Sequence, residues 1–343
     1  MAHPCSACVE TALARDCDGL LRTRRQRCQY GAGVTRRIWS NAKLSPVEGE
    51  RFAEQLAPHE LVAAARFEDA EIAVGQPEVE SCLASKRLAW VHLTSAGWDR
   101  FDQPRVQRAF VERGVALTTS AAVYSEPCAQ HVVGFMLAEA RQLPRSLRRQ
   151  LTERGWAHRE VRAASTLLGP QTTVVLVGFG KIAARIAALL APFGARVIGV
   201  RRAPSGAEPV PTVAMAELPR LLPEADHVVD ILPGGPHTQH VFDATLFGLL
   251  KPGAVFYNIG RGSTVEQGAL LSALESGRLR AAYLDVTEPE PLPPEHPLWR
   301  APNCTITPHA AGGHVDESAR LVAHLLQNLT RFAAGNALLD RVI

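Results

Sequence analysis

The chain has 343 residues, of which 46% are hydrophobic and 21% charged, and its formal net charge at neutral pH is +3. This length is enough for two domains of ordinary size, and the composition is typical of a soluble globular protein. The small net charge argues against a nucleic-acid partner, and no apolar run approaches the length of a membrane span. The first residues lack the layout of a signal peptide and the seven cysteines are scattered, so we expect reduced thiols in a cytoplasmic protein.

Residues 1–34 differ from the rest of the chain and show little hydrophobic periodicity. They contain four of the cysteines, Cys5, Cys8, Cys17 and Cys28. The Cys5–Cys8 spacing suggests zinc, but neither a second such pair nor a histidine pair accompanies it. We therefore predict no bound metal and either a disordered extension or a start codon assigned too early.

From residue 35 onward, short apolar segments alternate with helical ones, which is typical of α/β proteins. Strands are predicted at 36–39, 61–65, 72–74, 88–93 and 115–118, and helices at 46–56 and 79–85. Ser45 and Pro46 fit the N-cap and the first turn of the first helix. These elements predict a small parallel sheet that precedes any cofactor motif.

Two helical segments follow this region. The first is predicted at 125–143, with Ser125 as its N-cap and Pro127 in its first turn. The second, at 144–156, carries several arginines, which we interpret as the solvated face of a helix.

The segment 173–202 predicts a strand, a glycine turn, a helix and a second strand. Its turn has the pattern G-x-G-x-x-A, in which Gly178 permits the tight bend, Gly180 lets the backbone approach a pyrophosphate, and Ala183 allows close packing of helix and strand. The helix N-terminus offers free N–H groups to the phosphates. This unit predicts that the chain binds a dinucleotide.

The alternation continues after this unit to the end of the chain. Helices are predicted at 216–222, 246–250, 267–276 and 316–334, and strands at 227–232, 254–259, 281–285 and 304–307. Several polar motifs follow these strands directly, and ligands bind at strand ends in open parallel sheets.

Three of these motifs are specific: NIGRG at 258–262, DVTEPEP at 285–291 and TPHAAG at 307–312. Together with the fingerprint and Leu232-Pro233, they resemble the D-isomer-specific 2-hydroxyacid dehydrogenase family over residues 35–343. The resemblance implies two Rossmann-like, doubly wound α/β domains joined by two long helices. The substrate domain would be discontinuous, at 35–130 and 312–343, and the dinucleotide-binding domain would cover 131–311. Family members are usually homodimers.

The resemblance also implies a reaction, which is hydride transfer between a nicotinamide and a 2-oxo or 2-hydroxy acid. Arg261 would hold the substrate carboxylate and polarise the carbonyl, since its planar fork suits both tasks. His309 would deliver the proton to the new alkoxide. Glu290 would accept a hydrogen bond from the other imidazole nitrogen, orient the ring and favour its protonated form.

Further site residues are carried over from the matching motifs. Asp285 would contact the nicotinamide carboxamide, and the substrate would meet backbone N–H groups of Ser95, Ala96 and Gly97, with Gln76 at another wall of the pocket. The remaining residues expected to bind the cofactor are Gly178, Phe179, Gly180, Lys181, Ile182, Arg201, Arg202, Leu232, Pro233, Ile259, Gly260 and Gly312.

The end of the second strand of the dinucleotide unit bears on which nicotinamide is used. NAD enzymes usually place an acid there for the ribose hydroxyls, but this chain has Arg201 and Arg202. Arginine binds a 2′-phosphate through paired hydrogen bonds, so we predict NADP(H), with NAD(H) as the alternative.

The resulting expectation is a reductase of small 2-oxo acids, of the glyoxylate and hydroxypyruvate type. Two alternatives remain open. One is a dehydrogenase of the same family for a bulkier 2-oxo acid, and the other is a nucleotide-sensing binding protein resembling the family's transcriptional corepressors.

Overall fold

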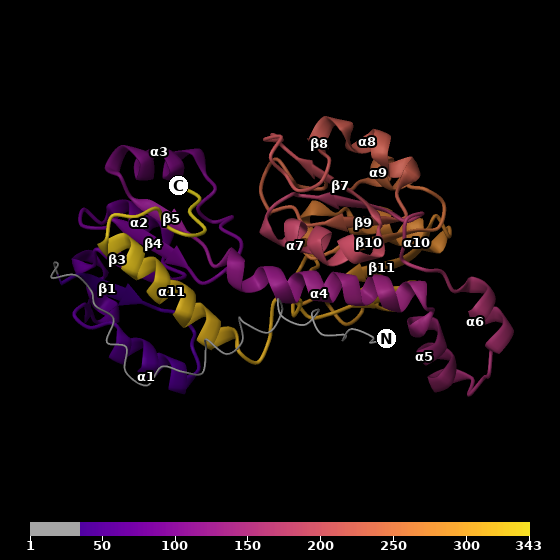
Figure 1. Cartoon of the computed structure of the whole chain (residues 1–343), viewed down its shortest axis with the longest axis horizontal. Helices are drawn as coiled ribbons and strands as arrows, with labels where there is room; N and C mark the ends of the chain where they lie inside the picture. The colour runs from indigo at the N-terminus through magenta and orange to yellow at the C-terminus, as the bar shows by residue number, and fades with distance from the viewer. Residues whose placement is uncertain (1–34) are drawn as a thin grey trace, which may run out of the picture.

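The computed structural model describes residues 35–343, which form two lobes, each built around a parallel β-sheet covered by helices (Figure 1). The predictions for residues 1–34 fall outside the described part of the chain. The predicted fold class, α/β with two doubly wound sheets, is confirmed. The long helix α4 (Ala121–Ala140) extends from one lobe along the other (Figure 1).

The first sheet has five parallel strands in the order β2-β1-β3-β4-β5. Its strands are β1 (Arg37–Ser40), β2 (Glu60–Leu61), β3 (Ile72–Gly75), β4 (Trp90–Leu93) and β5 (Ala116–Thr118). Helices α1 (Pro46–Gln55), α2 (Val79–Ala84), α3 (Pro104–Arg113) and, from the chain's end, α11 (Glu317–Ala333) complete this lobe. The strand order reverses between β1 and β3, as in flavodoxin-like sheets.

The second sheet has seven parallel strands in the order β12-β11-β10-β9-β6-β7-β8. They are β6 (Thr173–Val177), β7 (Arg196–Arg201), β8 (Thr212–Ala214), β9 (His227–Asp230), β10 (Ala254–Asn258), β11 (Leu279–Leu284) and β12 (Cys304–Ile306). Its helices are α7 (Lys181–Leu190), α8 (Leu218–Leu221), α9 (Ala244–Leu249) and α10 (Gln267–Glu275). The order is that of a dinucleotide-binding sheet with one added strand, and it reverses between β6 and β9.

Burial explains why these strands are largely apolar, with polar residues such as Asp230 and Asn258 at their ends. Every residue of β6, β9 and β10 is buried, because helices cover both faces of the sheet. Helix α4 packs along α7, and its buried face, which includes Ala129, Val132 and Met136, joins one hydrophobic core of the second sheet. Helix α11 instead packs on the first sheet through Val322, Leu325 and Leu329.

The start of α4 corrects a prediction. The helix begins at Ala121, and not at Ser125, so Pro127 is its seventh residue. Proline cannot donate to the carbonyl of Val123, which weakens the helix locally. The helix nevertheless continues, because Val123 and Cys128 are buried on either side of this point, and their packing outweighs the lost hydrogen bond.

The strand predicted at 61–65 is also wrong for most of its length. Strand β2 ends at Leu61, and residues Ala64–Asp69 form a 3₁₀ helix. The indole Nε1 of Trp39 donates to the carbonyl oxygen of Ala64 at 2.9 Å, so a side chain binds the backbone group that a longer strand would pair. Helix α3 and strand β8 were not predicted.

Two helices project from the second lobe, α5 (Leu143–Thr152) and α6 (His158–Ala164) (Figure 1). The arginines of α5 include Arg149, whose guanidinium pairs with Glu160 of α6 at 2.8 Å. Within residues 35–343, no helix combines the length and the apolar character that crossing a membrane requires.

Candidate active site

The carboxyl ends of the strands gather most of the expected site residues along two sheet edges. In the second sheet, Gly178 follows β6, Arg261 lies just beyond β10, and His309 lies just beyond β12. In the first sheet, Gln76 follows β3 and the segment 95–97 follows β4. The arrangement matches the rule that ligands bind outside the carboxyl ends of parallel strands.

His309 and Glu290 form a hydrogen-bonded pair. Nδ1 of the imidazole lies 2.9 Å from Oε2 of Glu290, and the side chains are 53% and 38% exposed. The other carboxylate oxygen, Oε1, accepts from the backbone N–H of Thr287 at 3.1 Å, which fixes the carboxylate. With the Nδ1 proton donated to Glu290, Nε2 of the ring is available for proton exchange.

Asp285 holds the backbone that carries His309. Its buried carboxylate accepts from the Thr307 hydroxyl at 2.6 Å and from the backbone N–H groups of Ala310 and Ala311 at 2.8 and 2.9 Å. His309 has a positive φ of 49°, a strained conformation for a residue with a side chain. These bonds account for three of the acceptor positions of Asp285, so it supports the histidine turn in addition to any contact with a nicotinamide.

Arg261 connects the two sheets. Its Nε donates to Oδ2 of Asp99 at 2.8 Å, and Nη1 donates to the carbonyl oxygen of Gly260 at 2.7 Å. Asp99 belongs to the loop after β4, so this ion pair joins the edge of the first sheet to the edge of the second. A Cβ atom on Gly97 would overlap Nη2 of Arg261, so only glycine leaves the guanidinium in its place there.

The loop after β4 is closed by its own hydrogen bonds. The Ser95 hydroxyl donates to the carbonyl of Gly97 at 2.6 Å and accepts from Nε2 of Gln76 at 3.1 Å. Gln76 is in turn held by Asn41, whose Oδ1 accepts from its backbone N–H at 2.7 Å. Residues from three loops of the first sheet are therefore tied together next to Arg261.

The glycine turn after β6 has the form that a pyrophosphate requires. Gly178 has a φ of 96°, and a Cβ there would lie 2.7 Å from the carbonyl oxygen of Ile231. A Cβ on Gly180 would meet nothing within 4 Å, so the backbone borders open space where phosphates can approach. Lys181 begins α7 and pairs with Asp340 of the C-terminal segment, while Phe179 is buried and Ile182 packs against the core.

The neighbouring turns pack backbone against backbone. A Cβ on Gly260 would lie 2.5 Å from the carbonyl oxygen of Leu232, and one on Gly262 would overlap the backbone of Thr287. Leu232 and Ile259 are buried beneath these turns, whereas Pro233 is exposed. Gly312 is similarly constrained, because a Cβ there would lie 2.9 Å from the Tyr124 ring.

Arg201 ends β7 but is already paired. Its Nη1 donates to Oε1 of Glu208 at 2.9 Å, and the same carboxylate accepts from the backbone N–H and hydroxyl of Ser205 and from the N–H of Gly206. These hydrogen bonds, first of all those from Ser205, lower the pKa of Glu208 to about 2. Arg202 is exposed beside this cluster. The acid seven residues beyond the strand is close to Arg201 only because the loop folds back.

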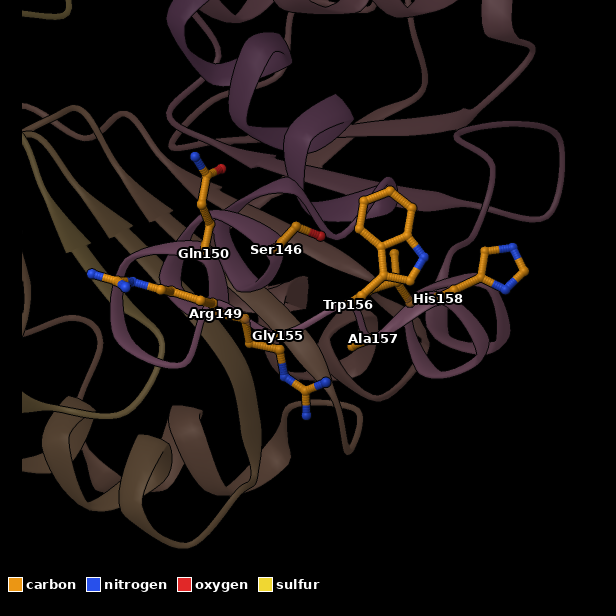
Figure 2. A pocket seen from close by; sticks show the side chains of 9 residues that line it. Ser146, Arg149, Gln150, Gly155, Trp156, Ala157 and His158 are labelled. Carbon is orange, nitrogen blue, oxygen red and sulfur yellow. The ribbon is translucent and has the colours of Figure 1, made fainter.

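A hollow of about 520 Å³ lies elsewhere, between α5 and α6, where Arg149, Trp156 and His158 line it (Figure 2). It contains none of the expected site residues. In the described part of the chain, no group of three or more histidine, cysteine, aspartate or glutamate residues is arranged to hold a metal ion.

Sequence reasoning missed four residues of this region: Asp99, Asp230, Thr287 and Glu208. Asp99 lies in the turn that was singled out after β4, two residues after Gly97, and its acidic character next to an expected arginine was the available signal. Thr287 lies inside the motif at 285–291, and its N–H binds Glu290 only three residues away. The contacts of Asp230 with Thr264 and of Glu208 with Arg201 join segments that meet only in the folded chain, and no spacing in the sequence indicates them.

Comparison with known proteins places these features in a family. The family model described as "D-isomer specific 2-hydroxyacid dehydrogenase, NAD binding domain" matches residues 133–311. A glyoxylate/hydroxypyruvate reductase B from Escherichia fergusonii is 32% identical, over 86% of this chain and 88% of its own length.

Two solved structures resemble the whole described fold. The NADPH-dependent glyoxylate/hydroxypyruvate reductase of Sinorhizobium meliloti, in complex with NADP and sulfate, has a TM-score of 0.74 at 27% identity and covers 90% of this chain and 98% of its own. A D-isomer specific 2-hydroxyacid dehydrogenase from Xanthobacter autotrophicus, in complex with NADPH and MES, has a TM-score of 0.76 at 26% identity with the same coverage. The chain therefore belongs to the D-isomer specific 2-hydroxyacid dehydrogenase family and is an NAD(P)-dependent oxidoreductase.

Proposed function

We propose that this protein uses NADPH to reduce a small 2-oxo acid, of the glyoxylate or hydroxypyruvate type, to a D-2-hydroxy acid. The observation that supports this most directly is the pairing of His309 with Glu290 at the same sheet edge as Arg261, which the first sheet contacts through Asp99. Such a set supplies an acid, its orienting carboxylate and a cation for a carboxylate substrate.

The residues divide the work of the reduction as follows. The turn at Gly178 and Gly180 and the N-terminus of α7 would hold the pyrophosphate of a nicotinamide cofactor, which would supply the hydride when bound. Arg261 binds the substrate carboxylate and polarises the carbonyl, and the backbone N–H groups of 95–97 bind the same carboxylate. His309 donates its Nε2 proton to the alkoxide as hydride arrives, while Glu290 stabilises the ring in the required orientation.

The preference for NADPH rests on Arg201 and Arg202 at the end of β7. A 2′-phosphate would bind Arg202, which is exposed, and would compete with Glu208 for Arg201. The two related structures described above contain NADPH or NADP, so these two relatives bind the phosphorylated cofactor that we propose for this protein. NAD(H) is the alternative, in which Arg201 stays with Glu208.

The decisive experiment is a panel of 2-oxo acids assayed by the loss of NADPH absorbance, repeated with NADH. We expect glyoxylate or hydroxypyruvate to give the highest kcat/KM, and NADPH to be preferred to NADH. Arg261→Ala should lose nearly all activity, and Arg201→Asp with Arg202→Ala should reverse the cofactor preference. NADPH binding without turnover of any 2-oxo acid would contradict the proposal and favour a nucleotide-sensing protein.

We further propose that residues 35–130 and 312–343, around the first sheet, form the substrate domain and that residues 131–311 form the cofactor domain.

We also propose that the protein is a homodimer. Apolar side chains that point to solvent on α5 and in the loop after it support the dimer: Leu147 is 56% exposed, Leu151 74% and Trp156 92%. Light scattering should give twice the chain mass, and Leu147→Glu with Leu151→Glu should give the monomer. A wild-type monomer would contradict this.

A further inference from the structure

Asp230 is a buried acid at the sheet edge that carries Gly178 and Arg261, and none of the steps above uses it. It is the last residue of β9, its exposure is 0%, and it lies between Val177 of β6 and Asn258 of β10. An aspartate in such a position needs a partner for each carboxyl oxygen, because a buried polar group without a hydrogen bond destabilises the fold.

The hydrogen bonds of Asp230 lead to Arg261. Its Oδ1 accepts from the backbone N–H of Leu232 at 3.0 Å, and its Oδ2 lies 2.5 Å from the Thr264 hydroxyl oxygen. The same hydroxyl oxygen lies 2.6 Å from the carbonyl oxygen of Arg261. Thr264 is itself completely buried.

One hydroxyl hydrogen cannot serve both of these contacts. The Arg261 carbonyl can only accept, and an ionised Asp230 can only accept, so one of the two short oxygen–oxygen contacts would be repulsive. Both become hydrogen bonds when Asp230 carries a proton. Asp230 then donates to Thr264, and Thr264 donates to the carbonyl of Arg261.

The surroundings favour this protonated form. Val177 and Asn258, the partners on the two flanking strands, carry no charge, and Thr264 and the backbone of Leu232 complete the polar contacts. The nearby cation, Arg261, directs its guanidinium to Asp99 and to the Gly260 carbonyl instead. Burial raises the pKa of Asp230 to about 7.

We propose that Asp230 is a positioning residue for Arg261 and acts in its protonated form. Protonated Asp230 donates a hydrogen bond to the Thr264 hydroxyl, which in turn donates to the backbone carbonyl of Arg261. These two hydrogen bonds hold the turn at 258–264 in place. Asn258 supports the same carbonyl, since its Nδ2 donates to it at 2.9 Å. Loss of the Asp230 proton removes one of the hydrogen bonds that fix the Arg261 backbone. The guanidinium is then less precisely placed, so the substrate binds less tightly.

This inference rests on the proposed role of Arg261 as the substrate anchor, and it makes an unusual prediction about pH. The KM for the 2-oxo acid should rise roughly threefold to tenfold as the pH increases through the neutral range, the loss expected for one buried hydrogen bond. The KM for the 2-hydroxy acid in the reverse direction should rise in the same way. A change in proton transfer at His309 would instead act oppositely in the two directions, because reduction needs its proton and oxidation needs its free nitrogen.

Asp230→Asn is the test variant. The amide keeps the shape of the acid, its oxygen can accept from Leu232, and its NH₂ group donates permanently to Thr264. We expect the alkaline rise in KM to disappear in both directions. Asp226→Asn, immediately before the start of the same strand, is the matched control and should keep the wild-type pH profile.

Thr264 gives a second, independent variant. Thr264→Ser retains the hydroxyl and should retain the pH dependence, whereas Thr264→Val should raise KM at every pH and abolish the dependence. An alkaline rise in KM that persists in Asp230→Asn would overturn the proposal.

A direct readout needs no catalysis. Carbon NMR of isotope-labelled aspartate in the protein without ligands should show a carboxyl signal that titrates near neutral pH and is absent from Asp230→Asn. A signal that titrates only in the ordinary aspartate range would overturn the proposal, whatever the assays show about the substrate. A titrating signal without activity on any 2-oxo acid would contradict the proposed function alone.

Discussion

Substituting Gly97 by alanine should displace the guanidinium of Arg261 while leaving the fold intact. The added Cβ would overlap Nη2 and lie 3.1 Å from Cζ of Arg261 and 3.4 Å from Oδ2 of Asp99. The guanidinium is the end of a flexible side chain that is 33% exposed, so it can move aside. Since Gly97 is not among the glycines with positive φ, alanine fits its backbone without strain.

The expected loss falls on substrate binding. Displacing the guanidinium breaks its 2.8 Å bond to Asp99 and removes a charge-assisted hydrogen bond to the substrate carboxylate, which contributes about 1.5–3 kcal/mol. At about 1.4 kcal/mol per tenfold, the KM for the 2-oxo acid should rise roughly 10- to 100-fold. The Arg261–Asp99 pair is partly exposed, so the free energy of unfolding should change by no more than about 1 kcal/mol.

Steady-state kinetics and thermal unfolding measure both effects. Gly49→Ala, in α1, is the control, since a Cβ there meets nothing within 4 Å and the change should leave the kinetics unaltered. A Gly97→Ala enzyme whose KM for the 2-oxo acid stays within about twofold of wild type would refute this reasoning, because loss of a charge-assisted hydrogen bond to the substrate should raise KM much more. An equal rise in the KM for NADPH would show general damage instead.

Three further predictions concern other groups of the site. Glu290→Gln should lower the kcat of reduction roughly 10- to 100-fold with little change in substrate KM, because protonated His309 loses its negatively charged partner. A change in KM alone would contradict this expectation. Glu208→Gln should raise kcat/KM for NADPH roughly threefold to tenfold and leave that for NADH unchanged, because it frees Arg201 for the phosphate; an unchanged NADPH to NADH ratio would count against competition for that arginine. Asp230→Asn should unfold at the same temperature as wild type at about pH 4 and at a higher temperature than wild type at about pH 9. The reason is that the pKa of Asp230 in the folded chain, about 7, exceeds the ordinary 3.8, so the wild type loses stability as the pH rises between these values, by at most about 4 kcal/mol. Equal unfolding temperatures of wild type and Asp230→Asn at about pH 9 would contradict the raised pKa of Asp230.

The part of the fold that the sequence predicts well is the part that follows from local patterning. The segment 173–202 forms the expected strand, turn, helix and strand, because buried parallel strands are apolar throughout and the turn needs small residues. The motif residues Arg261, Asp285 and His309 could likewise be placed at strand ends, since each lies within three residues of a largely apolar strand.

Other features were lost because distant packing decides them. Helix α4 begins before Pro127 because buried neighbours outweigh the missing hydrogen bond. Helix α3 is mostly polar and has only Val106 and Phe110 buried, so few apolar residues mark it in the sequence. The proline at its start and Gly114 at its end, with a φ of 68°, were the signals that could have identified it. Glu208 reaches Arg201 through a loop, and no periodicity encodes such a contact.

His309 lies on the connection between β12 and α11, the return crossing from the second sheet to the first. Its bonds are all to the second-sheet side, to Glu290 through the ring and to Asp285 through the backbone. The Arg261 guanidinium, by contrast, is also paired with the first sheet, through Asp99. Any separation of the two sheets would therefore break the Arg261–Asp99 pair and leave the His309–Glu290 pair intact. The orientation of the imidazole is independent of the contact between the sheets, whereas the placement of the guanidinium depends on it.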